Sequence, residues 1–189
     1  MLSDRVKKVK PSATLEITAK AKALREKGRD IITFGAGEPD FDTPEHIKNA
    51  LIKALEEKFI YYTPAPGIPE LRKAISEKLK RDNGIDCIAD EVIVTPGAKQ
   101  AIYEAVQAVT NPGDEVLIPD PWWVSYVPMV QLADGNPVFV TTYEEDGFRL
   151  KPEAIEAKIT GRTRALILNS PNNPTGSVLL KEDLKGIAD

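Results

Sequence analysis

A glycine and a lysine lie where an apolar run gives way to a helical pattern. Residues 91–95, EVIVT, read as a buried strand, and PGAKQ follows at 96–100. The free N–H groups of a helix's first turn, together with the helix dipole, suit a phosphate. Gly97 and Ala98 would let an anion approach the backbone closely, and Lys99 adds a positive charge. The alternative is an ordinary strand-to-helix turn, since the stretch is neither a Walker loop nor a GxGxxG motif.

Two adjacent tryptophans follow the next apolar run. The stretch from Asp120 to Tyr126 reads DPWWVSY and comes directly after the strand-like residues 115–119. One flat indole ring could stack on an aromatic cofactor, and the alternative is core or interface packing. The Asp-Pro pair that precedes the tryptophans is compatible with a cis peptide bond.

A loop rich in proline and asparagine, SPNNPTG at 170–176, ends the apolar run RALILN. Its prolines prevent the strand from continuing. An asparagine just past a strand end can direct its amide into a cleft, where it could hold a ring hydroxyl or phenolate. The alternative is a tight loop with no ligand. A fourth stretch, FGAGEPDF at 34–41, has glycines that permit close approach by a carboxylate, and its alternative is a flexible loop.

Helical and extended patterns alternate along the chain and must position these stretches. Strands are predicted at 91–95, 115–119, 136–143 and 164–169, and helices at 12–27, 43–58, 67–84, 96–109, 151–159 and 179–189. In the second helix Thr43 is the expected N-cap and Pro44 the first helical residue. This alternation predicts an α/β fold with a mostly parallel sheet, whose ligands bind beyond the carboxyl ends of the strands.

The composition is that of a soluble globular protein. The 189 residues are 42% hydrophobic and 29% charged, and the net charge of −4 argues against nucleic acid as the main partner. Cys87 is the one cysteine, so an intramolecular disulfide is impossible and a reducing compartment is expected. The N-terminus lacks the apolar core of a secretory signal, and no run reaches the length of a membrane span. We therefore expect a cytoplasmic protein without membrane partners.

Five stretches, in this order and spacing, resemble the class I aminotransferases: GAGEPDF, YYTPAPGIPELR, TPGAKQA, PDPWWVSY and NSPNNPTG. These are pyridoxal-phosphate enzymes of fold type I, and the similarity is nearest to the bacterial and archaeal aspartate aminotransferase subgroup. It extends over essentially the whole chain. The resemblance implies a mostly parallel sheet flanked by helices. Residues 1–45 would contribute to a small domain, and residues 46–189 would form the N-terminal part of the cofactor-binding large domain.

The resemblance also implies roles for particular residues. Gly97, Ala98 and Lys99 fall on the loop that cradles the cofactor phosphate. Trp123, the second of the pair, matches the ring that stacks on the pyridine. Asn173 matches the side chain that hydrogen-bonds the phenolic oxygen of the cofactor, which would help tune the protonation of its Schiff base.

Substrate binding is implied at four positions: Gly37, Lys99, Trp123 and Asn173. Gly37 would contact the side of the α-carboxylate. Lys99 would meet the distal carboxylate of an acidic substrate, which favours aspartate or glutamate; the alternative is a phosphate-binding or solvent-exposed lysine. Tyr62 matches a tyrosine that reaches the cofactor phosphate of the neighbouring subunit, which implies a homodimer.

The resemblance places three groups needed for transamination beyond Asp189. They are the Schiff-base lysine, an acid against the pyridine nitrogen and an arginine for the α-carboxylate. The chain is therefore expected to be an N-terminal portion that contains no catalytic residue and no metal ligand and is inactive alone. For the full-length protein we expect transamination from an amino acid, with aspartate expected, to a 2-oxo acid, with 2-oxoglutarate expected. A β-lyase or amino-acid synthase of the same fold, or a non-catalytic fragment that needs a complementing chain, stays open as an alternative.

The resemblance further implies a sheet whose strands are out of sequence order. We expect strand 91–95 at one edge, separated from strand 164–169 by two later strands. Another later strand is expected between 164–169 and 115–119. Residues 1–189 alone would then expose unpaired backbone and apolar faces, so the isolated chain is expected to aggregate or rearrange.

Overall fold

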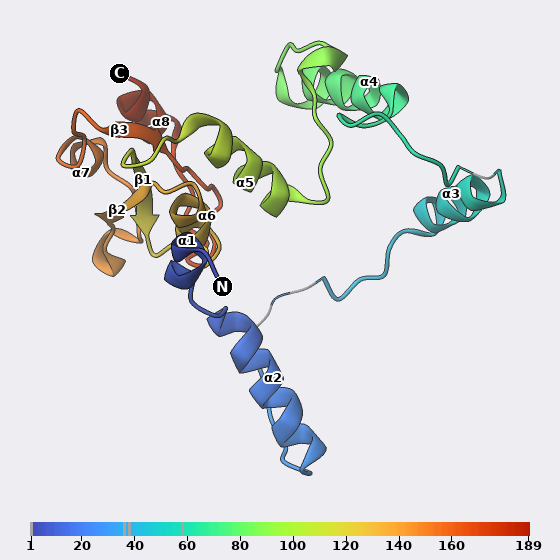
Figure 1. The fold of residues 1–189 in the computed structure, drawn as a ribbon, viewed down its shortest axis with the longest axis horizontal. Helices are drawn as coiled ribbons and strands as arrows, with labels where there is room; N and C mark the ends of the chain where they lie inside the picture. The colour runs from blue at the N-terminus through green and yellow to red at the C-terminus, as the bar shows by residue number, and fades with distance from the viewer. Residues whose placement is uncertain (1, 36, 38, 58) are drawn as a thin grey trace. The chain divides into compact units, whose positions relative to one another are not determined.

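The computed structural model describes residues 2–35, 37, 39–57 and 59–189, which form two compact units. One unit contains Met1–Glu16 with Lys99–Asp189, and the other contains Ile17–Ala98. The ribbon of both is drawn in Figure 1. Two positions of the glycine-rich stretch, 36 and 38, lie outside the described residues.

A three-stranded parallel sheet is the centre of the first unit. Its strand order is β2-β1-β3, with β1 at Glu115–Asp120, β2 at Asn136–Thr141 and β3 at Thr163–Leu166. The first four residues of β1 are buried, as expected for the central strand of a parallel sheet that is covered on both faces. Three of the four predicted strands are thus confirmed, and they lie in a parallel sheet.

Helices cover both faces of this sheet (Figure 1). Successive side chains of a strand point to opposite faces, so Val116 and Ile118 of β1 face one layer and Leu117 faces the other. The first layer contains α5 (Ala98–Val109) and α6 (Tyr126–Leu132), and its buried core is Val106, Val116, Ile118, Tyr126, Met129, Val130 and Ala133. The second contains α7 (Pro152–Glu156) and α8 (Lys181–Ala188), and its buried core is Leu117, Val140, Leu150 and Ile155.

Two short helices were not predicted from the sequence. The first is α6, which follows the tryptophan pair and supplies three residues of the first core. The second is α1 (Asp4–Lys8), which contacts α6 and whose Arg5 guanidinium lies 3.8 Å from the Asp134 carboxylate. Each has fewer than eight residues, which is too short for a 3.6-residue period to stand out.

The expected separation of strand 164–169 from strand 115–119 is wrong. β3 pairs directly with β1: Val116 lies opposite Ala165, and the N–H of Ile167 donates to the Leu117 carbonyl at 3.0 Å. A register irregularity between Glu115 and Val116 accommodates the pairing. The backbone groups of β1 therefore find partners on both sides from within residues 115–167, without an intervening strand.

The second unit is helical in the parts that the structure describes. The helix α2 (Ala13–Glu26) begins in the first unit and continues into the second, and α3 covers Glu45–Glu56. The helix α4 (Pro69–Lys78) continues as a π-helical turn at Leu79–Asn83 and ends at Gly84, whose φ of 68° is left-handed. All three helices were predicted. Among the described residues no helix is long and apolar enough to cross a membrane.

Two predictions about this unit are corrected. The N-cap of α3 is Pro44 rather than Thr43, and it makes no side-chain capping bond. Residues 91–95 pair with no strand of the described chain, although Val92 is buried. Their backbone bonds elsewhere: the Val92 carbonyl accepts from Arg72 Nε at 3.0 Å, and the Val94 N–H donates to the Pro66 carbonyl at 3.0 Å.

Candidate functional site

The loops that carry Trp123 and Asn173 begin at one edge of the sheet of the first unit. β1 ends just before the tryptophan pair, and β3 ends just before the loop that contains the two adjacent asparagines. Thr142, which follows β2, is tied to β1, because its N–H and hydroxyl donate to the Asp120 carbonyl at 3.0 and 2.7 Å. This carboxyl-end edge is where parallel sheets bind their ligands.

The two tryptophans have different surroundings. The Trp122 ring stacks on Phe139 of β2, with 4.3 Å between centroids and 19° between planes, so the packing alternative is correct for this residue. The Trp123 ring meets the Tyr126 ring edge-on at 5.4 Å. The Lys99 Nζ lies over the face of the Trp123 ring, 5.1 Å from its centroid. Trp123 is therefore the ring that lies beside a cationic group.

The start of α5 supplies that cation. Lys99 is the second residue of the helix, and Gly97 and Ala98 directly precede it in the chain. Gly97 has a φ of 85°, a left-handed conformation that favours glycine, and no described atom lies within 4 Å of the place where a Cβ would stand. The helix has 12 residues, so its first N–H groups and dipole favour an anion.

The adjacent asparagines of the loop after β3 also differ. The Asn173 side chain is exposed and makes none of the hydrogen bonds found among the described residues. Asn172 is half-buried, and its Nδ2 donates to the Pro121 carbonyl at 3.3 Å and to Thr175 Oγ1 at 2.9 Å. The peptide bonds before Pro121 and Pro174 are cis. Asn173 is thus free to meet a ligand, whereas Asn172 is engaged within the protein.

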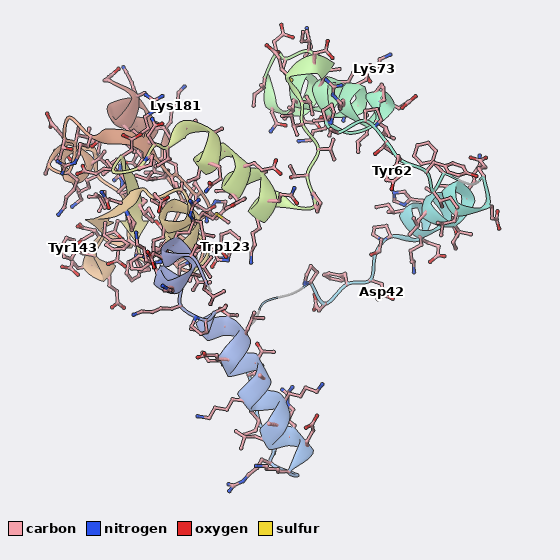
Figure 2. The ribbon with its side chains drawn as sticks, in the orientation of Figure 1. Asp42, Tyr62, Lys73, Trp123, Tyr143 and Lys181 are labelled. Atoms are coloured by element: carbon pink, nitrogen blue, oxygen red, sulfur yellow. The ribbon has the colours of Figure 1, made fainter. Side chains whose placement is uncertain are left out.

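Gly97 and Ala98 are the last residues of the second unit, which also contains the predicted residues Tyr62 and Gly37. The part of all four in this site stays a prediction. Tyr62 projects from the segment between α3 and α4 and is fully exposed (Figure 2). Gly37 has no described atom within 4 Å of the place where a Cβ would stand. Its backbone is therefore accessible to a small anion.

A small pocket is lined by residues at or just after the carboxyl ends of the three strands, among them Pro119, Thr142 and Ile167. It has a volume of about 30 Å³, enough for a water molecule and far too little for an aromatic cofactor. Its polar lining comes from Tyr126, Thr142, Asn169, Asn172 and Ser177. Burial raises the pKa of the Tyr126 phenol, which therefore stays protonated at neutral pH.

The chemistry of the site suits a flat aromatic ring that carries a phosphate. The helix start and the Lys99 ammonium favour the phosphate, the Trp123 face offers stacking, and the Asn173 amide offers a donor for a ring oxygen. Asn172 and Asn169, which hold the loop of Asn173, had no role predicted from the sequence. The sequence did contain a signal for Asn169: it ends an apolar run and is followed by prolines, which prevent the strand from continuing.

The match to a family sequence model agrees with this chemistry. The family described as aminotransferase class I and II matches residues 29–189. The chain is 52% identical over 188 residues to the probable aspartate/prephenate aminotransferase of Thermus aquaticus. That alignment covers 100% of this chain and 49% of the relative.

Solved structures extend the comparison to the fold. Aspartate aminotransferase from Thermus thermophilus with maleate gives a TM-score of 0.96 at 51% identity, covering 100% of this chain and 49% of that one. Alanine aminotransferase from Pyrococcus furiosus gives 0.93 at 39% identity, covering 99% and 48%. The chain spans about half the length of the relatives it matches.

Proposed function

The chain belongs to the class I and II aminotransferases, and from this membership we propose that it forms the cofactor-binding part of an aspartate-type aminotransferase. Its fold is that of the fold type I enzymes among its structural relatives. The reaction we propose moves an amino group from an amino acid, with aspartate preferred, to a 2-oxo acid, with 2-oxoglutarate preferred. The cofactor is pyridoxal 5′-phosphate.

The observation that carries this proposal is the Lys99 ammonium 5.1 Å from the centroid of the Trp123 ring, at the start of α5. A cation, a helix N-terminus and an aromatic face are the groups that a pyridine ring with a phosphate needs. When bound, pyridoxal phosphate supplies an aldehyde that condenses with amines and a ring that accepts electrons from the substrate Cα.

Each residue then has a defined task. The N–H groups of the first turn of α5, from Ala98 onward, would donate to the phosphate, and Gly97 would leave room for it, since the Gly97 N–H itself donates to the Thr95 carbonyl at 2.7 Å. The Trp123 face would hold the ring plane. The Asn173 amide would donate to the ring oxygen and so would favour the ionised form of that oxygen. In the proposed homodimer, the exposed Tyr62 reaches the phosphate site of the partner. The backbone of Gly37 borders the α-carboxylate of the substrate.

Two tasks are not assigned to any lysine or arginine of residues 1–189. These are the covalent bond to the cofactor, with the proton transfer at the substrate Cα, and the fork that holds the α-carboxylate. We place both, together with the acid against the pyridine nitrogen, outside residues 1–189. A preparation of residues 1–189 alone should therefore show no transamination.

The relatives support acidic substrates but do not agree on the amino acid. One is named a probable aspartate/prephenate aminotransferase, and another was solved with maleate, a dicarboxylate. A third is named an alanine aminotransferase. Lys99 favours a second carboxylate on the substrate, which supports aspartate over alanine.

The test is a substrate panel with the protein as its source organism makes it, supplied with pyridoxal phosphate. Aspartate with 2-oxoglutarate should yield oxaloacetate and glutamate, with prephenate and alanine assayed in parallel. Release of ammonia and a 2-oxo acid from one substrate would instead indicate a lyase and overturn the proposal. Activity that appears only after a second polypeptide is added would indicate a complementing chain.

A further inference from the structure

Asn172 holds its own loop together through its backbone. Its N–H donates to the Ser177 carbonyl at 2.8 Å, and its carbonyl accepts from the Gly176 N–H at 2.8 Å. Its side-chain amide donates to Thr175 Oγ1 at 2.9 Å. These bonds fix the position of Asn172 within the loop that follows β3.

The same side chain reaches a different loop. Its Nδ2 lies 3.3 Å from the carbonyl oxygen of Pro121, two residues before Trp123. The Pro121 carbonyl can only accept a hydrogen bond, so the end of the Asn172 amide that faces it must be the nitrogen, which donates. Asn172 thus joins the loop that carries the Asn173 amide to the loop that carries the Trp123 ring.

Asn169, which follows β3, bonds to the backbone of Asn173. In the amide orientation that gives both its oxygen and its nitrogen a partner, the Asn169 oxygen accepts from the Asn173 N–H at 2.8 Å. Its nitrogen then donates to the Pro171 carbonyl at 3.2 Å. The Asn173 N–H is therefore bonded to the Asn169 side chain, and the preceding residue, Asn172, is fixed by its own backbone hydrogen bonds.

We propose that Asn172 is a positioning residue that sets the spacing between the Trp123 ring face and the Asn173 amide. The inference rests on the proposed function, because the ring face and the amide matter together only if one flat ligand contacts both. Asn172 itself does not touch the ligand. Its loss should leave the phosphate site at the start of α5 unchanged and should let the two loops move independently.

The experiment compares variants of the protein as its source organism makes it, after the cofactor has been removed. All variants also carry Trp122→Phe, which reduces competing fluorescence. The variants are Asn172→Ala and Asn172→Asp; the aspartate keeps the shape of the side chain and removes its N–H donors. Ser170→Ala is the matched control. It removes the 3.0 Å bond that ties the same segment to the Leu179 N–H, away from Pro121.

Pyridoxamine 5′-phosphate is the probe for affinity, because it has no aldehyde to react with surface lysines. Its binding is followed by quenching of tryptophan emission. Both Asn172 variants should weaken binding by about tenfold and reduce the quenching at saturation. With pyridoxal 5′-phosphate bound, the pH at which its absorption changes should move upward, since the ring oxygen loses a well-placed donor.

The outcomes separate the inference from the function that it rests on. If the unsubstituted protein does not bind the probe, the proposed function fails. If it binds, and the Asn172 variants match Ser170→Ala in affinity, quenching and absorption, the inference is overturned while the function stands. If circular dichroism shows that Asn172→Ala is unfolded, Asn172→Asp decides by the same readouts.

Discussion

At the scale of single residues, identical neighbours have different tasks. Trp122 stacks on Phe139 against the first core, while Trp123 faces the Lys99 ammonium. The surroundings of each side chain depend on the direction in which it leaves the backbone and on which residues of other elements lie next to it. That information is not local. Residue types and spacing could therefore identify the tryptophan pair and the asparagine pair, but they could not predict which member of each pair packs within the protein and which is exposed to a ligand.

Lys99 allows a direct test of specificity. Replacement by methionine keeps most of the length of the side chain and removes its charge. We expect kcat/KM for aspartate to fall about 10- to 100-fold more than kcat/KM for alanine, because only aspartate loses a bond from Lys99 to a distal carboxylate, whereas both lose the contribution of Lys99 to the phosphate site. Steady-state kinetics with both amino acids measure this. Equal losses for both would show that Lys99 serves the phosphate instead of the distal carboxylate.

At the scale of elements, local patterns predicted the helices well. The positions of α2, α3 and α4 follow from the spacing of apolar residues and from Gly84, which ends the helical segment with a left-handed φ. The strand prediction for residues 91–95 failed because a strand requires a partner. The carbonyl of Val92 is instead bonded by the Arg72 side chain.

The turn before α5 can be tested with a matched pair of glycines. Gly97 and Gly113 have φ values of 85° and 87°, and at neither does a described atom lie within 4 Å of the place where a Cβ would stand. Alanine at either position should therefore cost about 1–2 kcal/mol from backbone strain alone. Only Gly97→Ala should also weaken binding of pyridoxamine 5′-phosphate, by about tenfold. Thermal melts and fluorescence titration separate the effects, and equal affinities would contradict a phosphate site at this turn.

The start of α8 is held by an ion pair whose strength depends on pH. The Asp183 side chain is 5% exposed, and Arg149 Nε donates to its two oxygens at 2.8 and 2.9 Å. This bonding, with help from the Leu180 N–H, lowers the pKa of the Asp183 carboxyl. A carboxyl whose pKa is lower in the folded state stabilises the fold above its unfolded value of about 3.9, and this stabilisation is lost in more acidic solution.

Asp183→Asn should therefore lower the melting temperature at pH 7, and the difference from the unsubstituted protein should shrink as the pH falls from about 4 towards 3. Melts in the whole protein at several pH values measure this difference. Glu182→Gln is the control, because that carboxylate is exposed and lies 3.4 Å from Arg149 Nη2, so its removal should change little. A difference that stays constant from pH 7 to about pH 3 would contradict the assignment.

At the scale of the whole molecule, the fold class could be predicted because strand and helix patterns alternate, but the strand order could not. Pairing of β1 with β3 joins residues far apart in sequence, and no local feature of Val116 or Ala165 specifies that partner. The resemblance to a family located the motifs. It did not predict the hydrogen bond from Asn172 to the Pro121 carbonyl, which joins the two loops.

The second unit presents apolar side chains that have no cover from the described residues of that unit. On α3 alone, Ile47, Leu51, Ile52 and Leu55 are each at least half exposed. Such a surface favours association, so residues 1–189 expressed alone should form oligomers or aggregates at micromolar concentration. Size-exclusion chromatography with light scattering measures this. A monodisperse monomer of 20.8 kDa that melts cooperatively would contradict the prediction.

The position of β1 between two later strands also has a consequence for synthesis on the ribosome. Glu115 pairs with Asn136 on one side and with Thr163 on the other. The second partner is made about 50 residues after β1, which takes about 3–10 s at a pace of about 5–20 residues per second. During that interval the growing chain can complete only the β1–β2 pair. One edge of its most buried strand is then open to chaperones before β3 arrives.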